Sequence, residues 1–415
     1  MLPVLQPEPL WDIVEEHLDE AEFLWELWEH SLVSPKYTMA EVEAGPRARL
    51  DAHIDALVAH GQEVAETLLL PVLASETAEP TRVSAAATTL LLSPSEVGVM
   101  AVLEALQTNS IQRPAIARAL EACDRPNLPA NIEPFLHALD LDVRDAAARV
   151  MVFKRRPLGK VLTTLLSSDR ATAQKAGLQA LLYERATDQN RRAVLQAFRA
   201  HEPGVRDAAW TAAAVLRLPQ VWPELRARAL ELGCGHALLL LALRGTPEDH
   251  SLIIGALERA ELRASALWAL GFLGTPDAVE ASLRFLDDPV LGRLAGEVFS
   301  TITGVDIESE GMTCPSHDDG KMIYLPELEL STPNPQSILS WWLTHHQSLR
   351  LSNVQCLELT VFPRSNLGGC KCRRLQASEL GAALREQAKK RSITSEPGIS
   401  SDRRLRRAAG TGFKP

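Results

Sequence analysis

The chain has few aromatic residues, no long apolar run and few cysteines for its length. Aromatic side chains make up only 5% of its 415 residues, so a core would have to be packed mainly by alanine and leucine. The longest uninterrupted apolar stretch, residues 237–243, is far shorter than the roughly 20 residues that a membrane-spanning helix requires. The sequence therefore predicts no association with a membrane.

The first residues and the cysteines favour a cytoplasmic protein. The start, Met1-Leu2-Pro3-Val4, lacks the basic region and the apolar core of a secretion signal. Six cysteines spread through a long chain without such a signal are typical of reduced thiols. Cys370 and Cys372 form the only close pair, which by itself is weak evidence for metal or redox chemistry. We expect no cofactor.

Basic residues are in the minority, and the charge is unevenly placed. Residues 1–80 contain 17 acidic and 3 basic residues, a net charge of −14, within a chain of net charge −10. Residues 364–415 contain 13 basic and 4 acidic residues, a net charge of +9. Binding to a nucleic-acid backbone requires a concentrated positive surface. We therefore expect no nucleic-acid partner, except through the basic tail.

Five basic residues lie at a constant spacing of 31 positions: Arg82, Arg113, Arg144, Lys175 and Arg206. A fixed period of this size is the signature of stacked repeats, each of which buries its apolar face against its neighbours. The next expected position is Ala237, and the pattern resumes less regularly at Arg263 and Arg293. We call these seven basic residues the ladder. The spacing predicts seven or eight helical hairpins in residues 81–303.

Each repeat is expected to contain two helices. The residues around the ladder positions are small and helix-forming, with alanine prominent, which predicts closely packed inner helices. Second helices with helical apolar spacing are expected at residues 97–106, 132–139, 158–166, 194–198 and 253–257. Proline and glycine turn signals separate the two sets.

Several of these segments resemble the short bacterial form of the HEAT-repeat family. The resemblance is carried by Val143-Arg144-Asp145-Ala146-Ala147, by Val205-Arg206-Asp207-Ala208-Ala209 and by the segment from Leu262-Arg263 onward. It implies an all-α, right-handed α-solenoid of helical hairpins about 31 residues long. It also implies that the ladder arginines are mainly structural and pair with acidic groups or carbonyls of neighbouring repeats. The alternative is a phosphate-binding stripe.

Residues 1–80 are expected to form an acidic helical cap. Amphipathic patterns predict helices at residues 10–32, 47–60 and 64–73. Trp11, Trp25 and Trp28 either seal the end of the solenoid or contact a partner. Histidines in this region suggest a metal site, but the spacings between His17, His30, His53 and His60 place no clear pair on one helical face.

Residues 304–350 are predicted to be an irregular acidic loop followed by a capping helix that contains Trp341 and Trp342, two further candidates for partner contacts. The loop and helix hold the richest set of potential zinc ligands in the chain: Cys314, His317, Asp318, Asp319, His345 and His346. No two of them have a recognised ligand spacing. Residues 351–415 are basic with little periodicity, which is typical either of disorder or of the product of a reading-frame change.

The two ends carry a second and more specific resemblance. Residues 16–25, residues 49–57, Gly304-Val305-Asp306-Ile307, Tyr324-Leu325-Pro326 and Trp341-Trp342 look like an uncharacterised proteobacterial family of HEAT-like proteins. The genes of that family often lie near type VI secretion components and effectors. The resemblance implies an accessory or interaction role, carries over no functional residue and does not extend to the tail.

The leading functional hypothesis is a non-enzymatic scaffold or adaptor that holds another protein, with an effector or adaptor of a type VI secretion system as the expected partner. The alternative is an enzyme on a HEAT scaffold, metal-dependent or similar to a lyase or glycosylase, with a pocket on the concave face. HEAT-like hydroxylases use several His-Glu dyads, whereas this chain has only His201-Glu202. It also lacks phosphate-loop, H-E-x-x-H and G-x-S-x-G motifs.

Overall fold

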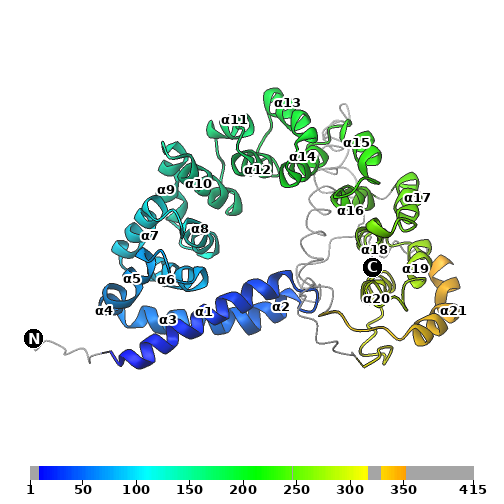
Figure 1. The fold of residues 1–415 in the computed structure, drawn as a ribbon, viewed down its shortest axis with the longest axis horizontal. Coiled ribbons are helices and arrows are strands. Elements are labelled where there is room, and N and C mark those ends of the chain that lie inside the picture. The colour runs from blue at the N-terminus through cyan, green and yellow to red at the C-terminus, as the bar shows by residue number, and fades with distance from the viewer. Residues whose placement is uncertain (1–8, 245, 316–328, 352–415) are drawn as a thin grey trace, which may run out of the picture.

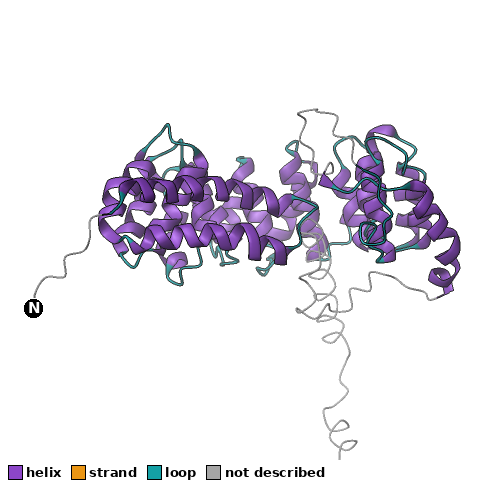
Figure 2. Ribbon diagram, turned by 90° about the horizontal axis from the view of Figure 1, so that it is seen from below, coloured by secondary structure: helices purple, strands orange, loops and turns teal. Residues whose placement is uncertain are grey.

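The computed structural model describes residues 9–244, 246–315 and 329–351, and these are almost entirely helical or in short loops. Figure 2 shows only helices and connecting loops in this part of the chain. Thr313 forms an isolated antiparallel bridge with Pro333. The predicted all-α class is therefore confirmed. None of the helices described has the length and apolarity needed to cross a bilayer. The predicted basic tail, residues 351–415, lies outside the described residues except for Leu351, the last residue of the final helix.

The helices form an arch of two rows (Figure 1). Each inner helix packs against the next, in the order α6 (Pro80–Leu92), α8 (Arg113–Ala122), α10 (Leu141–Phe153), α12 (Ala171–Ala180), α14 (Pro203–Val215), α16 (Gly235–Arg244), α18 (Arg263–Leu270) and α20 (Gly292–Thr303). The outer row contains α7 (Glu96–Thr108), α9 (Leu128–Ile132), α11 (Val161–Leu166), α13 (Asp188–Gln196), α15 (Val221–Arg228), α17 (Pro247–Ala256), α19 (Pro276–Leu283) and α21 (Pro335–Leu351). One continuous apolar cluster extends from Val14 to Trp342.

The ladder positions lie in the first two turns of the inner helices. Arg82, Arg113 and Lys175, for example, fall near the starts of α6, α8 and α12. The 31-residue spacing therefore measures the chain length from one inner helix to the next. Ala237 lies at the equivalent place in α16, so the succession of helices continues where the basic residue is missing.

Local sequence explains where many of these helices begin and end. Asp140 begins α10 by accepting hydrogen bonds from two backbone amides, and the hydroxyl groups of Thr187 and Thr275 similarly cap α13 and α19. Gly304 ends α20 in the left-handed conformation, with φ of 77°. This is the residue at which the sequence predicted the helical rhythm to stop.

Three expected outer helices differ clearly from the prediction, and one of them, expected at residues 253–257, is α17, which begins at Pro247. The segment expected at residues 132–139 is α9 followed by the 3₁₀ turn Glu133–His137, and Leu139 is 99% exposed. Pro134 removes a backbone donor there, which prevents a regular α-helix from continuing. The segment expected at 194–198 begins earlier, as α13 at Asp188, and ends in the 3₁₀ turn Ala197–Arg199.

The head consists of three helical segments that pack on the first inner helix. Helix α1 (Trp11–Val33) contacts both α3 (Ala48–Ala59) and α6. The second segment begins before the predicted residue 47, with α2 (Met39–Val42) and the π-helical turn Glu43–Arg47 running into α3. The third is continuous from α4 (Gly61–Val64) through the π-helical turn Ala65–Leu69 to α5 (Leu70–Ala74). Thr38 and Glu41 form a capping box that fixes the early start.

Helix α1 closes the open side of the arch (Figure 1). Near its end, His30 Nε2 lies 3.0 Å from Glu329 Oε1, and the Ser34 hydroxyl also donates to Glu329. These partners are 299 and 295 residues apart in the sequence. The first helix and the segment that precedes α21 therefore hold the two ends of the arch together.

Candidate functional site

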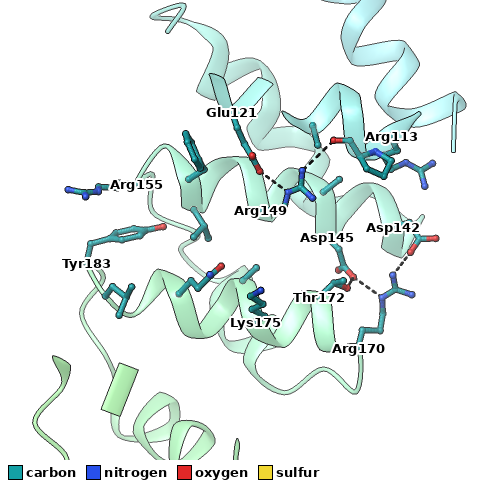
Figure 3. Close-up of a pocket in the computed structure, with 18 of the residues that line it drawn as sticks. Arg113, Glu121, Asp142, Asp145, Arg149, Arg155, Arg170, Thr172, Lys175 and Tyr183 are labelled. Carbon is teal, nitrogen blue, oxygen red and sulfur yellow. Dashed lines mark hydrogen bonds and ion pairs between the residues drawn. The ribbon is translucent and has the colours of Figure 1, made fainter. Parts of the chain in front are cut away.

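A groove of about 970 Å³ opens on the inner row of helices, and we call it the inner groove. Its walls come from α8, α10 and α12 and from the turns that follow α10 and α12. Figure 3 shows Lys175 rising from α12 on one side and Arg149 extending from α10 on the other. Three consecutive repeats thus form one surface.

The three carboxylates of the inner groove are held by arginines. Glu121 and Asp145 are only 7% and 6% exposed, so each would be costly to leave unpaired. Glu121 accepts a hydrogen bond from Arg149 Nε at 2.7 Å, and Asp145 accepts one from Arg170 Nε at 2.7 Å. Arg170 also donates to Asp142, and its hydrogen bonds to Asp145 and Asp142 raise the pKa of Arg170 above its ordinary value.

Two basic residues of the inner groove lack such partners. Lys175 and Arg155 are exposed, and neither forms an ion pair with a carboxylate of the described residues. The groove lining contains five basic and three acidic residues. Because the three carboxylates are already paired, the unpaired charge in the groove is positive.

Arg155 is held at the rim by the way in which α10 ends. Its φ of 52° places it in the left-handed region, where glycine is usual. The Arg156 amide donates to the Met151 carbonyl at 2.8 Å and the Arg155 amide to the Val152 carbonyl at 2.9 Å, which is the Schellman pattern. Arg217, two repeats later, has φ of 57° in the same pattern at the end of α14. The backbone therefore carries strain at a charged, exposed residue.

Aromatic side chains supply apolar surface in the inner groove. The Tyr183 hydroxyl donates to the Arg156 carbonyl at 3.2 Å, which orients the ring, and burial raises the pKa of Tyr183. Phe153 is 55% exposed, and its ring lies 5.5 Å from the Arg118 guanidinium carbon. The groove therefore combines positive charge with accessible aromatic surface.

Most ladder side chains contact other parts of the fold. Arg82 pairs with Glu22, Arg113 donates to the Leu106 and Gln107 carbonyls, Arg206 to that of Gly233, Arg263 to that of Leu257 and Arg293 to that of Leu330. Arg144 Nε is buried without a hydrogen-bond partner and lies 4.0 Å from Asp145. Lys175 is the ladder residue whose side chain stays exposed.

Other residues of the inner groove were not predicted from the sequence. Arg149 of the groove lies 31 positions after Arg118, a residue outside the lining, and this spacing is a signal that could have been found. Together they hold Glu121, with Arg118 Nη1 at 3.2 Å. Nothing in the spacing distinguishes Tyr183 or Glu121 from other polar residues near a helix end.

No protein-family model matches this chain, and no curated protein matches it. Among solved structures, an engineered protein is 16% identical, with the match covering 79% of this chain and 95% of that chain at a TM-score of 0.33. Human deoxyhypusine hydroxylase in complex with glycerol is 14% identical, with 69% of this chain and 98% of that chain covered at a TM-score of 0.21. At these values neither similarity supports an argument about this chain.

The five tryptophans considered as partner contacts all pack against the apolar cluster. Trp25, Trp28 and Trp342 are 1%, 8% and 5% exposed, so they offer no face to a partner. Trp11 and Trp341 are partly buried against the same apolar cluster, and Trp341 packs edge-to-face with Phe299. Their positions favour the sealing role over the partner contact.

The potential metal ligands do not converge in the described part of the chain. Residues 9–244, 246–315 and 329–351 contain no group of three or more His, Cys, Asp or Glu side chains that could hold a metal ion. His17 and His53 do meet, with their Nδ1 atoms 3.0 Å apart, but they supply only two nitrogens. His345 and His346 bond the Trp341 and Trp342 carbonyls.

The other candidate ligands lie elsewhere or have a structural role. Cys314 is partly exposed next to the Thr313–Pro333 bridge, whereas His317, Asp318 and Asp319 lie outside the described residues, as do Cys370 and Cys372. Of the His201-Glu202 dyad, Glu202 caps α14 by accepting from the Gly204 amide.

Proposed function

We propose that this chain is a right-handed, HEAT-like α-solenoid that acts in the cytoplasm as a non-enzymatic scaffold or adaptor for another protein. The observation that carries the proposal is the inner groove, an open surface built by three consecutive repeats and lined by aromatic rings and unpaired cations. A surface of this kind suits protein recognition, because stacked repeats present extended concave faces. The resemblance to proteins encoded near type VI secretion genes makes a secretion effector or adaptor the first partner to test.

The chemistry of the inner groove favours binding over catalysis. Its lining contains no histidine or cysteine, and its carboxylates pair with arginines. Asp145 Oδ1, which has no hydrogen-bond partner, is buried 4.0 Å from Arg144 Nε rather than directed into the groove as a base. A general base or a metal ligand needs a free lone pair directed at the substrate. The alternative of an enzyme with a pocket on the concave face therefore gains no support from the residues that form this groove.

Affinity capture from the native cell tests the proposal. Full-length chain and its Lys175→Glu variant serve as baits, with Arg192→Glu as the matched control, because Arg192 is exposed on the outer helix α13. We expect quantitative mass spectrometry to identify a protein whose recovery falls with Lys175→Glu and is unchanged with Arg192→Glu. Recovery of no protein with this dependence would contradict the scaffold proposal. A partner unrelated to secretion would contradict only its more specific form.

A further inference from the structure

We infer, on the basis of the proposed function, that the inner groove binds an acidic polypeptide segment that carries a bulky apolar side chain. The inference specifies the chemistry of the partner, which the scaffold proposal leaves open. It rests on which charges of the groove are already paired, on where apolar surface is exposed and on the acidic surroundings of the groove.

The unpaired charges of the inner groove select an anionic partner. The three carboxylates of the lining are bonded to Arg149 and Arg170, whereas Lys175 and Arg155 have no carboxylate partner among the described residues. A partner carboxylate can therefore approach these cations without displacing an existing ion pair. Complementary charge of this kind raises the association rate and discriminates against cationic partners.

The apolar part of the inner groove favours a partner that carries a bulky apolar side chain in addition to its negative charge. The Tyr183 ring is oriented by its hydroxyl, and Phe153, which also lines the groove, is 55% exposed. Val152 and Leu182 continue this surface. Burying an aromatic or large aliphatic side chain here would remove apolar area from water on both partners.

A polypeptide fits this surface better than a nucleic acid does. Asp142 is 61% exposed at the groove, and Glu29 of the acidic helix α1 pairs with Arg118 at 2.6 Å nearby. These carboxylates repel a row of evenly spaced phosphates. A peptide, in contrast, can place its few carboxylates next to Lys175 and Arg155 alone. The basic residues 364–415 of the chain itself have the wrong sign to occupy the groove.

Fluorescence anisotropy with the full chain tests the inference directly. The probe is a labelled dodecapeptide that repeats Glu-Glu-Phe-Glu-Glu-Leu, compared with a version in which glutamine replaces glutamate and one in which serine replaces Phe and Leu. A labelled oligothymidylate of equal length is the nucleic-acid control. We expect saturable binding of the first peptide, weakened by salt, and at least about tenfold weaker binding of the other three probes.

Three groove variants locate the binding site. Lys175→Glu and Phe153→Ala are each expected to weaken binding of the first peptide about five- to tenfold, as loss of a central contact does. Arg155→Gly removes a cation while relieving the left-handed strain, so it is expected to weaken binding without lowering the thermal midpoint. Arg192→Glu makes the same charge change as Lys175→Glu on the outer row and is expected to leave affinity unchanged.

Several outcomes would overturn the inference. Equal weakening by Arg192→Glu would show non-specific attraction, tighter binding of the oligothymidylate would show a nucleic-acid groove, and self-association that excludes the peptide would show an interface between copies. Lack of peptide binding would refute the acidic-segment inference alone if cell capture still depends on Lys175. Failure of both experiments would refute the scaffold proposal as well.

Discussion

At the scale of single residues, the fold depends on buried carboxylates that arginines neutralise. Asp249 is fully buried and accepts a hydrogen bond from Arg226 Nε at 2.6 Å, while Glu248 binds the same arginine from an 81% exposed position. The hydrogen bond that Arg226 donates to Asp249 raises the pKa of Arg226. The two acidic neighbours form a natural pair for comparing a buried ion pair with an exposed one.

Replacing Asp249 with alanine is expected to lower the free energy of unfolding by about 2–3 kcal/mol, less than for a fully buried pair because Arg226 is about a third exposed and can turn to water. Glu248→Ala is expected to leave the free energy of unfolding almost unchanged, because Glu248 is exposed. Chemical denaturation of both variants measures the difference. Equal effects would show that burial of Asp249 does not determine the strength of this contact.

His236 provides a pH dependence with a definite sign. Burial lowers the pKa of His236 below 6.5, outweighing the attraction of Asp207, and Arg206 lowers it further. Thr211 Oγ1 lies 2.8 Å from His236 Nε2. Below pH 6.5 the unfolded chain takes up a proton at this residue while the folded chain does not. The free energy of unfolding therefore decreases as the pH is lowered from 6.5 to the folded-state pKa.

The His236→Gln variant is expected to show a smaller loss of unfolding free energy between neutral and mildly acidic pH than the parent chain, because glutamine does not titrate. Urea denaturation across this range, with His137→Gln as a histidine control elsewhere on the arch, measures the slope. A slope unchanged by His236→Gln, or changed equally by His137→Gln, would contradict the assignment.

At the scale of helices, close approach between neighbours explains particular small residues. A Cβ on Gly98 of α7 would lie 2.6 Å from the Leu90 carbonyl oxygen of α6, a backbone atom that cannot easily move. Gly255 of α17 has no atom within 4 Å of the same position. Both residues lie in helices, so replacing each with alanine separates the effect of packing from the effect of helix propensity.

Gly98→Ala is expected to lower the free energy of unfolding by about 1–3 kcal/mol through overpacking. Gly255→Ala is expected to raise it by about 0.5–1 kcal/mol, because alanine loses less backbone entropy in a helix. Thermal and chemical denaturation of both variants measures the two signs. Stabilisation by Gly98→Ala would mean that α6 and α7 do not pack as closely as the structure shows.

The sequence predicted the helices better than the contacts between them. The 31-residue spacing located the inner helices, and even Ala237, which breaks the basic pattern, falls at the expected place in α16. The pairing of Arg149 with Glu121, 28 residues away, depends on the rotation of one hairpin relative to the next. A spacing along the chain contains no information about that rotation, so the inner groove could not be predicted.

The details that the sequence missed within helices also have local causes. The capping box of Thr38 and Glu41 starts the second head segment early, and the π-helical turn Glu43–Arg47 accommodates Pro46 inside it. A pattern of apolar residues reports the buried face of a helix but not such adjustments. The meeting of His17 and His53 similarly requires the packing of α1 on α3.

At the scale of the whole molecule, the contact of α1 with the segment before α21 turns a row of repeats into a closed arch. His30 and Glu329 are 34% and 22% exposed, so their contact contributes modestly to stability. Its effect on shape is larger, because it joins the two ends of the arch.

Glu329→Ala is expected to widen the arch, which small-angle X-ray scattering would detect as a greater maximum dimension, while the free energy of unfolding changes by less than about 1 kcal/mol. Glu310→Ala, an exposed residue of the preceding loop, is the control. An unchanged scattering curve for Glu329→Ala would show that the packing of α1 alone determines the closure.

We propose above all that a protein partner binds to the inner groove. Photo-crosslinking in living cells tests it most directly, with a photoreactive amino acid placed at Gln179 in the groove or at Arg192 on the outer row. The account predicts a discrete protein adduct from position 179 and none from position 192. Adducts of the same protein from both positions, or only from position 192, would contradict it.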